Sequence, residues 1–228
     1  MTARLVQSLE IAPDTRHFVF EIQERDDFDY QPGQFVSLLH EIDGKSITRA
    51  YSLAGLPDGN RVELCLNLVD DGKLSPHLFA MQPGDSIDLK GPYGTFVFRE
   101  PRPTVMVATG TGVAPFRGML SRRLPQDETH PYTLIFGVRE EAKLLYRNDF
   151  ERLARTHPNF RFLPTLTRPS ESWTGRTGRV QSHLFELLGD RREVDVYICG
   201  LKAMVDDVRA KLKELGFERK QIIFEKYD

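Results

Sequence analysis

Short segments of alternating apolar and polar residues run through the N-terminal part of the chain. The clearest cover residues 17–22, 34–39 and 61–68, and a period of two is typical of strands that bury one face. A short helix is expected from Ser75, which stands as a candidate N-cap before Pro76. About six strands and one helix predict an antiparallel barrel for this part.

The pattern changes near residues 101–103, after which short apolar runs alternate with helical stretches. The clearest helix covers residues 201–215, with Leu201 on its apolar face and Gly216 as its terminator. Strands that alternate with helices predict a doubly wound parallel sheet. The runs expected to form its strands are residues 104–108, 132–136, 160–163, 194–199 and 221–224. We therefore expect two domains, residues 1–102 and 103–228.

Composition narrows the possible functions. The chain has 31 Lys and Arg against 33 Asp and Glu, so no basic field favours nucleic acid as a partner. Its two cysteines, Cys65 and Cys199, are too few for a four-thiolate iron–sulfur cluster or a disulfide-stapled fold. No apolar run is long enough to span a bilayer, and the N-terminus lacks a signal-peptide pattern. We expect a cytoplasmic protein without a membrane partner.

A glycine-rich turn follows the first strand of the second half, at Gly110-Thr111-Gly112-Val113-Ala114-Pro115. Backbone N–H groups in such a strand-to-helix turn can approach a pyrophosphate closely. Pro115 stands where a Rossmann fingerprint has its third glycine. By itself the motif fits a structural tight turn equally well.

Two segments of the first half carry groups that suit a flavin dinucleotide. Arg49-Ala50-Tyr51-Ser52 combines a cation for a diphosphate, a ring for stacking and a hydroxyl for hydrogen bonding. Gly72-Lys73-Leu74-Ser75, at the start of the expected helix, is a second candidate anion site. Taken singly, Arg49 also fits a surface ion pair, and Tyr51 also fits an aromatic residue at the barrel rim.

Taken together and in this order, the motifs resemble those of the ferredoxin–NADP⁺ reductase superfamily. Arg49-Ala50-Tyr51-Ser52 is similar to its flavin motif, and Gly110 to Pro115 to its nicotinamide-nucleotide loop. Further similar segments are Gly91 to Phe96, Phe136 to Arg139, Tyr197 to Gly200, and the aromatic Tyr227. The resemblance implies an antiparallel FAD-binding β-barrel followed by an α/β domain with a five-stranded parallel NAD(P)-binding sheet.

The resemblance also implies roles in binding FAD. Arg49 would bind the diphosphate, Tyr51 would stack on the isoalloxazine, and Ser52 would hydrogen-bond near the flavin N5, with Ala50 inside the same motif. The segment Gly72, Lys73, Leu74 and Ser75 would contact the diphosphate through backbone amides and the Ser75 hydroxyl.

On the nucleotide side, the pyrophosphate would lie on Gly110, Thr111, Gly112, Val113 and Pro115. Cys199 and Gly200 would lie near the nicotinamide, although Cys199 also fits a buried strand-end thiol. Glu225 resembles a carboxylate near the nicotinamide. Tyr227 resembles an aromatic that covers the flavin and moves aside during hydride transfer, although a frayed end is an alternative.

Several arginines are candidates for the extra phosphate of NADPH. Thr167 and Arg168 resemble the pair used by the NADP-specific branch, and Arg176 and Arg179 lie in a similar Gly-Arg segment. Arg139 is a further candidate. Glu140 and Glu141 follow it and would instead suit the ribose of NADH. These four arginines, which lie in three segments of the chain, favour NADPH over NADH.

The resemblance implies an FAD-dependent reductase of ferredoxin–NADP⁺ reductase type. Hydride would pass between NADP(H) and FAD, and single electrons would pass to or from a separate carrier such as ferredoxin or flavodoxin. Ser52, Cys199, Glu225 and Tyr227 would surround the reacting atoms. Two alternatives remain: an NADH-dependent reductase component of a multicomponent oxygenase, and a flavin-binding electron-transfer subunit without nicotinamide turnover.

Overall fold

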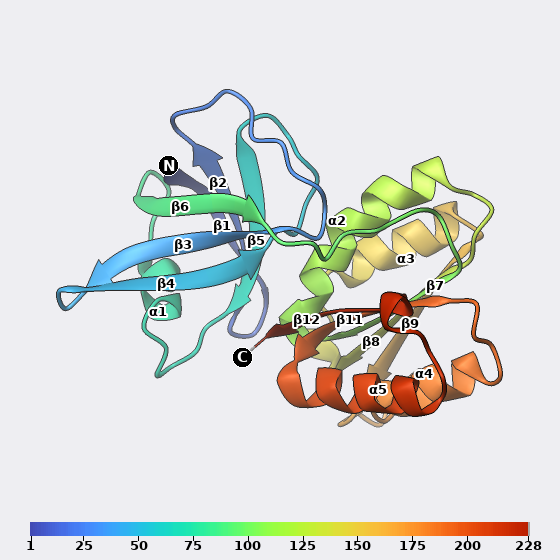
Figure 1. Cartoon of the computed structure of the whole chain (residues 1–228). Coiled ribbons are helices and arrows are strands. Elements are labelled where there is room, and N and C mark those ends of the chain that lie inside the picture. The colour runs from blue at the N-terminus through green and yellow to red at the C-terminus, as the bar shows by residue number, and fades with distance from the viewer. Residues whose placement is uncertain (228) are drawn as a thin grey trace. The chain divides into compact units, whose positions relative to one another are not determined.

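A computed structural model describes residues 1–227 and divides the chain into two units (Figure 1). The first unit contains Met1–Val97 together with Ala114–Arg122. The second unit contains Phe98–Val113 and the chain from Arg123 onward. The expected boundary after residue 102 lies in the segment just before the first strand of the second unit.

The first unit is a six-stranded antiparallel sheet with the strand order β4-β3-β6-β1-β2-β5. An isolated antiparallel bridge joins Leu53, just after β4, to Leu64 in β5 and so links the two edges of the sheet. The antiparallel barrel predicted from the alternating segments is therefore confirmed. The bounds are β1 Thr2–Ala12, β2 Thr15–Ile22, β3 Phe35–Ile42, β4 Lys45–Ser52, β5 Arg61–Asn67, α1 Ser75–Ala80 and β6 Ser86–Tyr93.

The barrel core is built from the apolar positions of the alternation. In β2 the side chains of Phe18, Phe20 and Ile22 are fully buried while the residues between them are partly exposed. The N-cap of α1 is Leu74 rather than Ser75, which is the first residue of the helix. The Ser75 hydroxyl instead accepts a hydrogen bond from the Val69 N–H at 3.1 Å, so it closes the preceding loop.

The second unit is a parallel sheet with the strand order β10-β9-β8-β7-β11-β12. All five predicted strands occur in it. The sixth, β10, has only two residues and no apolar run, so the hydrophobic pattern does not mark it. The strands are β7 Thr104–Thr109, β8 Tyr132–Val138, β9 Phe160–Leu166, β10 Arg176–Thr177, β11 Asp195–Leu201 and β12 Ile222–Tyr227.

Helices α4 and α5 pack on one face of this sheet (Figure 1). α5 starts at Lys202, and Leu201 ends β11 with 64% of its surface exposed, so its expected place on the apolar helix face is wrong. Gly216, with φ of 85°, follows the helix as predicted. The helical bounds are η1 Gly110–Val113, α2 Ala114–Arg123, η2 Leu124–Gln126, η3 Glu141–Lys143, α3 Arg147–Thr156, α4 Val180–Leu188, α5 Lys202–Glu214 and η4 Arg219–Gln221.

Within residues 1–227, no helix combines the length and the apolar character needed to cross a membrane.

Candidate functional site

The glycine-rich loop packs directly against the end of β11. A side-chain Cβ at Gly112 would lie 2.5 Å from the Cys199 carbonyl oxygen and 2.6 Å from the Cα of Gly200. Real Cβ atoms do not approach backbone this closely, so only glycine permits the contact. The structure thus brings together two motifs that lie almost ninety residues apart in the chain, at the carboxyl ends of β7 and β11, where parallel sheets bind ligands.

Thr109 completes this contact and was not singled out from the sequence. Its Oγ1 accepts a hydrogen bond from the Leu201 N–H at 3.3 Å. A Cβ at Gly200, where φ is 140°, would lie 2.3 Å from the same oxygen. The only sequence signal is a hydroxyl residue at the last position of β7, next to the glycine-rich loop.

Cys199 lies on β11, next to the end of the last strand of the sheet, β12. Its side chain is fully buried, and Glu225 is its register partner on β12. Burial, and next the charge of Glu225, raise the pKa of the Cys199 thiol well above its usual value, while a hydrogen bond from Tyr227 opposes the shift. The thiol is therefore protonated at neutral pH and is not a nucleophile.

Tyr227 is part of the sheet, since it pairs with Leu201 at the end of β12. A frayed end is therefore wrong for this residue. The structure brings Tyr227, Glu225 and Cys199 together, as the resemblance implies.

Two of the arginines predicted for a phosphate meet at the ends of β8 and β9. The Arg168 N–H donates to the Arg139 carbonyl at 2.7 Å, and the Thr167 N–H donates to Val138 at 3.1 Å. Both arginine side chains and that of Thr167 are exposed. Arg176 lies in β10 beside Thr165, and Arg179 is the N-cap of α4.

The two acids that favour NADH differ in their surroundings. Glu141 forms an ion pair with Arg147 at 2.6 Å, so its carboxylate already has a cationic partner. Glu140 is exposed. Of the two acids, Glu141 is thus the one whose carboxylate is less available to a ribose.

In the first unit, the flavin motif lies on β4, an edge strand of the sheet order. The Arg49 side chain is exposed, and its Nη1 donates to the Thr48 carbonyl at 2.8 Å. Tyr51 packs against the barrel core, and burial raises its pKa to about 12 while the nearby charge of Arg49 opposes the shift. Ala50 is exposed and Ser52 is buried. Arg49 and Tyr51 share one face, as the alternation predicts.

The second anion candidate is a tight loop that leads into α1. The Gly72 N–H donates to the Val69 carbonyl at 2.8 Å. A Cβ at Gly72 would lie 2.8 Å from both the Ser75 hydroxyl and that carbonyl. Lys73 is exposed and Leu74 is buried, so the loop presents one cation beside its backbone.

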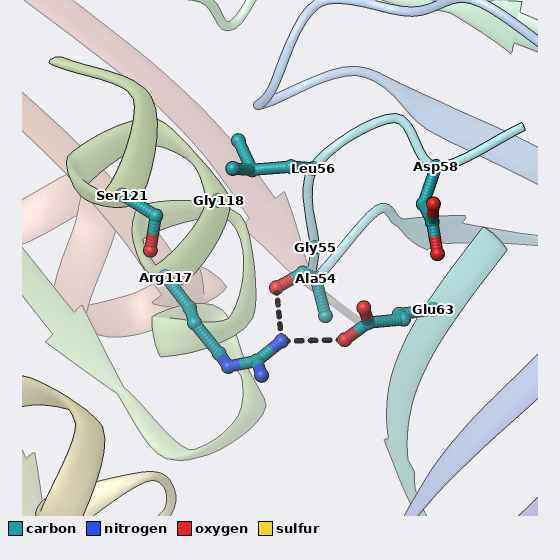
Figure 2. Close-up of a pocket in the computed structure, with 8 residues that line it drawn as sticks. All are labelled: Ala54, Gly55, Leu56, Asp58, Glu63, Arg117, Gly118 and Ser121. Carbon is teal, nitrogen blue, oxygen red and sulfur yellow. Dashed lines mark hydrogen bonds and ion pairs between the residues drawn. The ribbon is translucent and has the colours of Figure 1, made fainter. Parts of the chain in front are cut away.

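A small cavity of about 200 Å³ is formed where α2 packs on the barrel (Figure 2). Arg117 reaches across it and donates from Nη1 to the Ala54 carbonyl at 3.0 Å and to Glu63 Oε2 at 2.5 Å. His17 Nε2 lies 3.3 Å from the same carboxylate oxygen. The cavity is lined by Ala54, Gly55, Leu56, Asp58, Glu63, Arg117, Gly118 and Ser121.

Arg117 was also missed from the sequence. It fixes α2 to the segment that directly follows Ser52, and it does so through partners 54 and 63 positions away. The one feature of the sequence that points to Arg117 is its position two residues after Pro115 of the glycine-rich motif.

Among residues 1–227, no three His, Cys, Asp or Glu side chains gather as a metal site.

Comparisons with known proteins cover almost the whole chain. Residues 2–98 match the oxidoreductase FAD-binding domain family, and residues 106–210 match the oxidoreductase NAD-binding domain family. Ferredoxin–NADP reductase B of Sorangium cellulosum is 38% identical over 99% of this chain and 97% of that protein. The electron transfer component of toluate 1,2-dioxygenase from Pseudomonas putida is 32% identical over 87% of this chain, but only 59% of that protein is matched.

Solved structures agree with these relatives. A ferredoxin–NADP⁺ reductase from Neisseria gonorrhoeae with bound FAD and NADP superposes with a TM-score of 0.85 at 25% identity, over 99% of this chain and 98% of that one. The Amycolatopsis cytochrome P450 reductase GcoB superposes with a TM-score of 0.88 at 29% identity, over 99% of this chain and 68% of that one. With an FAD-binding domain followed by an NAD-binding domain, the chain belongs to the ferredoxin–NADP⁺ reductase family of oxidoreductases.

Proposed function

We propose that the protein is an FAD-dependent reductase that transfers hydride between NADPH and FAD. It exchanges single electrons with a separate carrier protein, such as a ferredoxin or a flavodoxin. The observation that carries the proposal is the match to a ferredoxin–NADP reductase over nearly the full length of both proteins.

The residues of the first unit fit FAD. Tyr51 offers a half-buried ring for stacking, and Arg49 offers an exposed guanidinium with donors to spare for a diphosphate. The loop from Gly72 to Ser75 offers the exposed ammonium group of Lys73 as a second cation for the diphosphate. Ser52 is buried beside Tyr51 and would hold a ring nitrogen by hydrogen bonding.

Bound FAD supplies the conversion between two-electron hydride transfer and one-electron exchange. The part played by this chain is orientation, because hydride transfer requires the reacting atoms about 3–3.5 Å apart. Gly110 to Pro115 would seat the pyrophosphate, and the packing of Gly112 on Gly200 supports a fixed position for the nicotinamide end. Cys199, which is fully buried and stays protonated, contributes a small neutral packing residue there rather than a proton.

The backbone hydrogen bond between Arg168 and Arg139, both with exposed side chains, supports NADPH as the nucleotide. Two exposed cations at the ends of adjacent strands suit a dianionic 2′-phosphate. The ion pair of Glu141 with Arg147 removes one acid that would favour NADH.

The second candidate is an NADH-dependent reductase component of a multicomponent oxygenase. It is favoured by the 32% identity to the toluate dioxygenase component, of which this chain spans 59%.

Anaerobic rapid mixing of the FAD-loaded protein with NADPH and with NADH tests the proposal. We expect NADPH to bleach the flavin absorbance faster, and steady-state turnover to follow with a ferredoxin or a flavodoxin. Faster reduction by NADH favours the oxygenase component. Flavin that neither nucleotide bleaches contradicts both enzymes and leaves an electron-transfer subunit without turnover.

A further inference from the structure

β12 is an edge strand of the second unit, and its side chains alternate between two faces. Phe224 and Lys226 lie on the face covered by α5, while Glu225 and Tyr227 lie on the face of Cys199. The same strand therefore makes one set of contacts with α5 on one face of the sheet and another set with Cys199 on the opposite face.

The contacts with α5 form a compact charged group. Lys226 Nζ lies 2.6 Å from Asp206 Oδ1, and Arg209 Nη1 lies 3.4 Å from the same oxygen. The Arg209 guanidinium also stacks 3.6 Å from the centre of the Phe224 ring. A hydrogen bond from Lys226 lowers the pKa of Asp206, so the carboxylate is charged at neutral pH.

On the opposite face, the side chains of the strand lie beside the fully buried Cys199 of β11. Glu225 is the register partner of Cys199, and Tyr227 hydrogen-bonds to the thiol. An edge strand has a neighbour on one side only, so its last residues separate easily unless side chains hold them.

We propose that Asp206, Arg209 and Lys226 form a latch that positions Glu225 and Tyr227 over Cys199. They are positioning residues, since their contacts are on the face opposite to Cys199. An effect of the latch on nucleotide binding rests on the proposed function. Its effect on the position of Glu225 and Tyr227 at Cys199 does not.

The ion pair between Lys226 and Asp206 is partly exposed to solvent and is therefore weak. The Asp206 side chain is 45% exposed and that of Lys226 is 29% exposed, so salt screens the pair. Exposed ion pairs of this kind are weak. Loss of the pair therefore shifts an opening equilibrium instead of unfolding the unit.

Labelling of Cys199 with a thiol reagent reports that opening, because a buried thiol reacts only when the cover moves. The experiment uses the FAD-loaded protein and follows each cysteine by mass spectrometry. Cys65, buried in the first unit, is the internal reference. The variants are Lys226→Met, Asp206→Asn and the conservative Lys226→Arg.

We expect labelling of Cys199 to accelerate about two- to fivefold in Lys226→Met and Asp206→Asn, as for loss of one exposed pair. Lys226→Arg keeps the pair with Asp206 and keeps labelling slow, and high salt accelerates the wild type but not Lys226→Met. The matched control is Lys220→Met, which removes the 2.9 Å pair with Glu218 in the same unit and leaves labelling unchanged. Equal labelling in wild type and latch variants overturns the proposal, as does acceleration in the control.

Nucleotide kinetics test the functional consequence. If Tyr227 covers the place where nicotinamide stacks, Lys226→Met lowers the Michaelis constant for NADPH about twofold while FAD stays bound. Accelerated labelling with unchanged nucleotide kinetics overturns the effect of the latch on nucleotide binding. A wild-type protein that oxidises no nucleotide contradicts the proposed function instead, and the labelling result distinguishes the two failures.

Discussion

Arg49 is the residue on which the flavin half of the proposed function depends most directly. Its side chain is exposed on an edge strand and uses one nitrogen for the Thr48 carbonyl. Arg49→Ala should weaken FAD binding by about 1.5–3 kcal/mol, the usual contribution of a charge-assisted contact. Equilibrium dialysis with flavin fluorescence measures the change.

Lys45→Ala is the matched control, because Lys45 is an exposed cation on the same strand. FAD affinity should stay at the wild-type value in this variant. An Arg49→Ala protein that holds FAD as tightly as the wild type would remove Arg49 from the diphosphate site.

Individual residues of the site also differ in how far the sequence alone identifies them. Gly112 and Gly200 were found because glycine itself marks a position where no side chain fits between two backbones, even though the partner backbone is distant in the chain. Thr109 and Arg117 were missed because their roles depend on partners 92 and 54 positions away. A lone threonine or arginine carries no local mark of such a distant partner.

At the scale of elements, the docking of α2 on the barrel depends on the absence of a side chain at Gly118. A Cβ there would lie 2.3 Å from the Gly55 carbonyl oxygen, which is backbone and cannot turn away. Gly118→Ala should therefore destabilise the protein by about 1–3 kcal/mol, the range for overpacking, even though alanine favours helix. Urea denaturation measures the loss.

Ser121→Ala, one turn further along α2 and also at the cavity, is the control for that substitution. It adds no atom, so its free energy of unfolding should stay within about 0.5 kcal/mol of the wild type. Equal stability of Gly118→Ala and the wild type would mean that α2 shifts without cost.

α1 and β3 are joined by two stacked histidine rings, those of His77 and His40, whose centres are 3.7 Å apart. Burial, and next the neighbouring His40, lower the pKa of His77 below its usual 6.5, while Asp85 opposes the shift. The unfolded chain thus binds a proton more readily than the folded one. The free energy of unfolding therefore has its maximal value above about pH 6.5, the pKa in the unfolded chain. It decreases as the pH falls through the lower pKa of His77 in the folded protein.

His77→Gln removes this titration, so its stability should fall less steeply between neutral and mildly acidic pH. Denaturation monitored by intrinsic fluorescence over that range gives both slopes. Identical slopes would exclude His77 as a source of the pH dependence.

Helices and strands could be predicted from the sequence where a buried face gave the hydrophobic residues a regular spacing. Phe18, Phe20 and Ile22 mark β2 by alternation, and continuous apolar runs mark the five long parallel strands. β10 escaped because two residues cannot show a period. The start of α5 was misplaced because Leu201 is apolar yet exposed at the end of β11, so hydrophobicity alone extended the helix by one residue.

For the molecule as a whole, the choice of nucleotide separates the two candidate enzymes. A carrier reductase working with NADPH needs cations for the 2′-phosphate, whereas an NADH-dependent oxygenase component does not. The exposed Arg168 lies beside Arg139 through a backbone hydrogen bond of 2.7 Å. That backbone contact keeps the loop in place when the side chain is changed.

Arg168→Ala should therefore raise the Michaelis constant for NADPH about tenfold, as for loss of one charge-assisted hydrogen bond of roughly 1.5 kcal/mol, and leave that for NADH nearly unchanged. Only NADPH presents the phosphate, so steady-state kinetics with both nucleotides isolates the contact. Arg155→Ala, an exposed arginine in the last turn of α3, is the control and should change neither constant. If both constants rise together in Arg168→Ala, the arginine supports the fold of the loop. If neither changes, the phosphate binds elsewhere or the enzyme uses NADH, and the oxygenase component becomes the better reading.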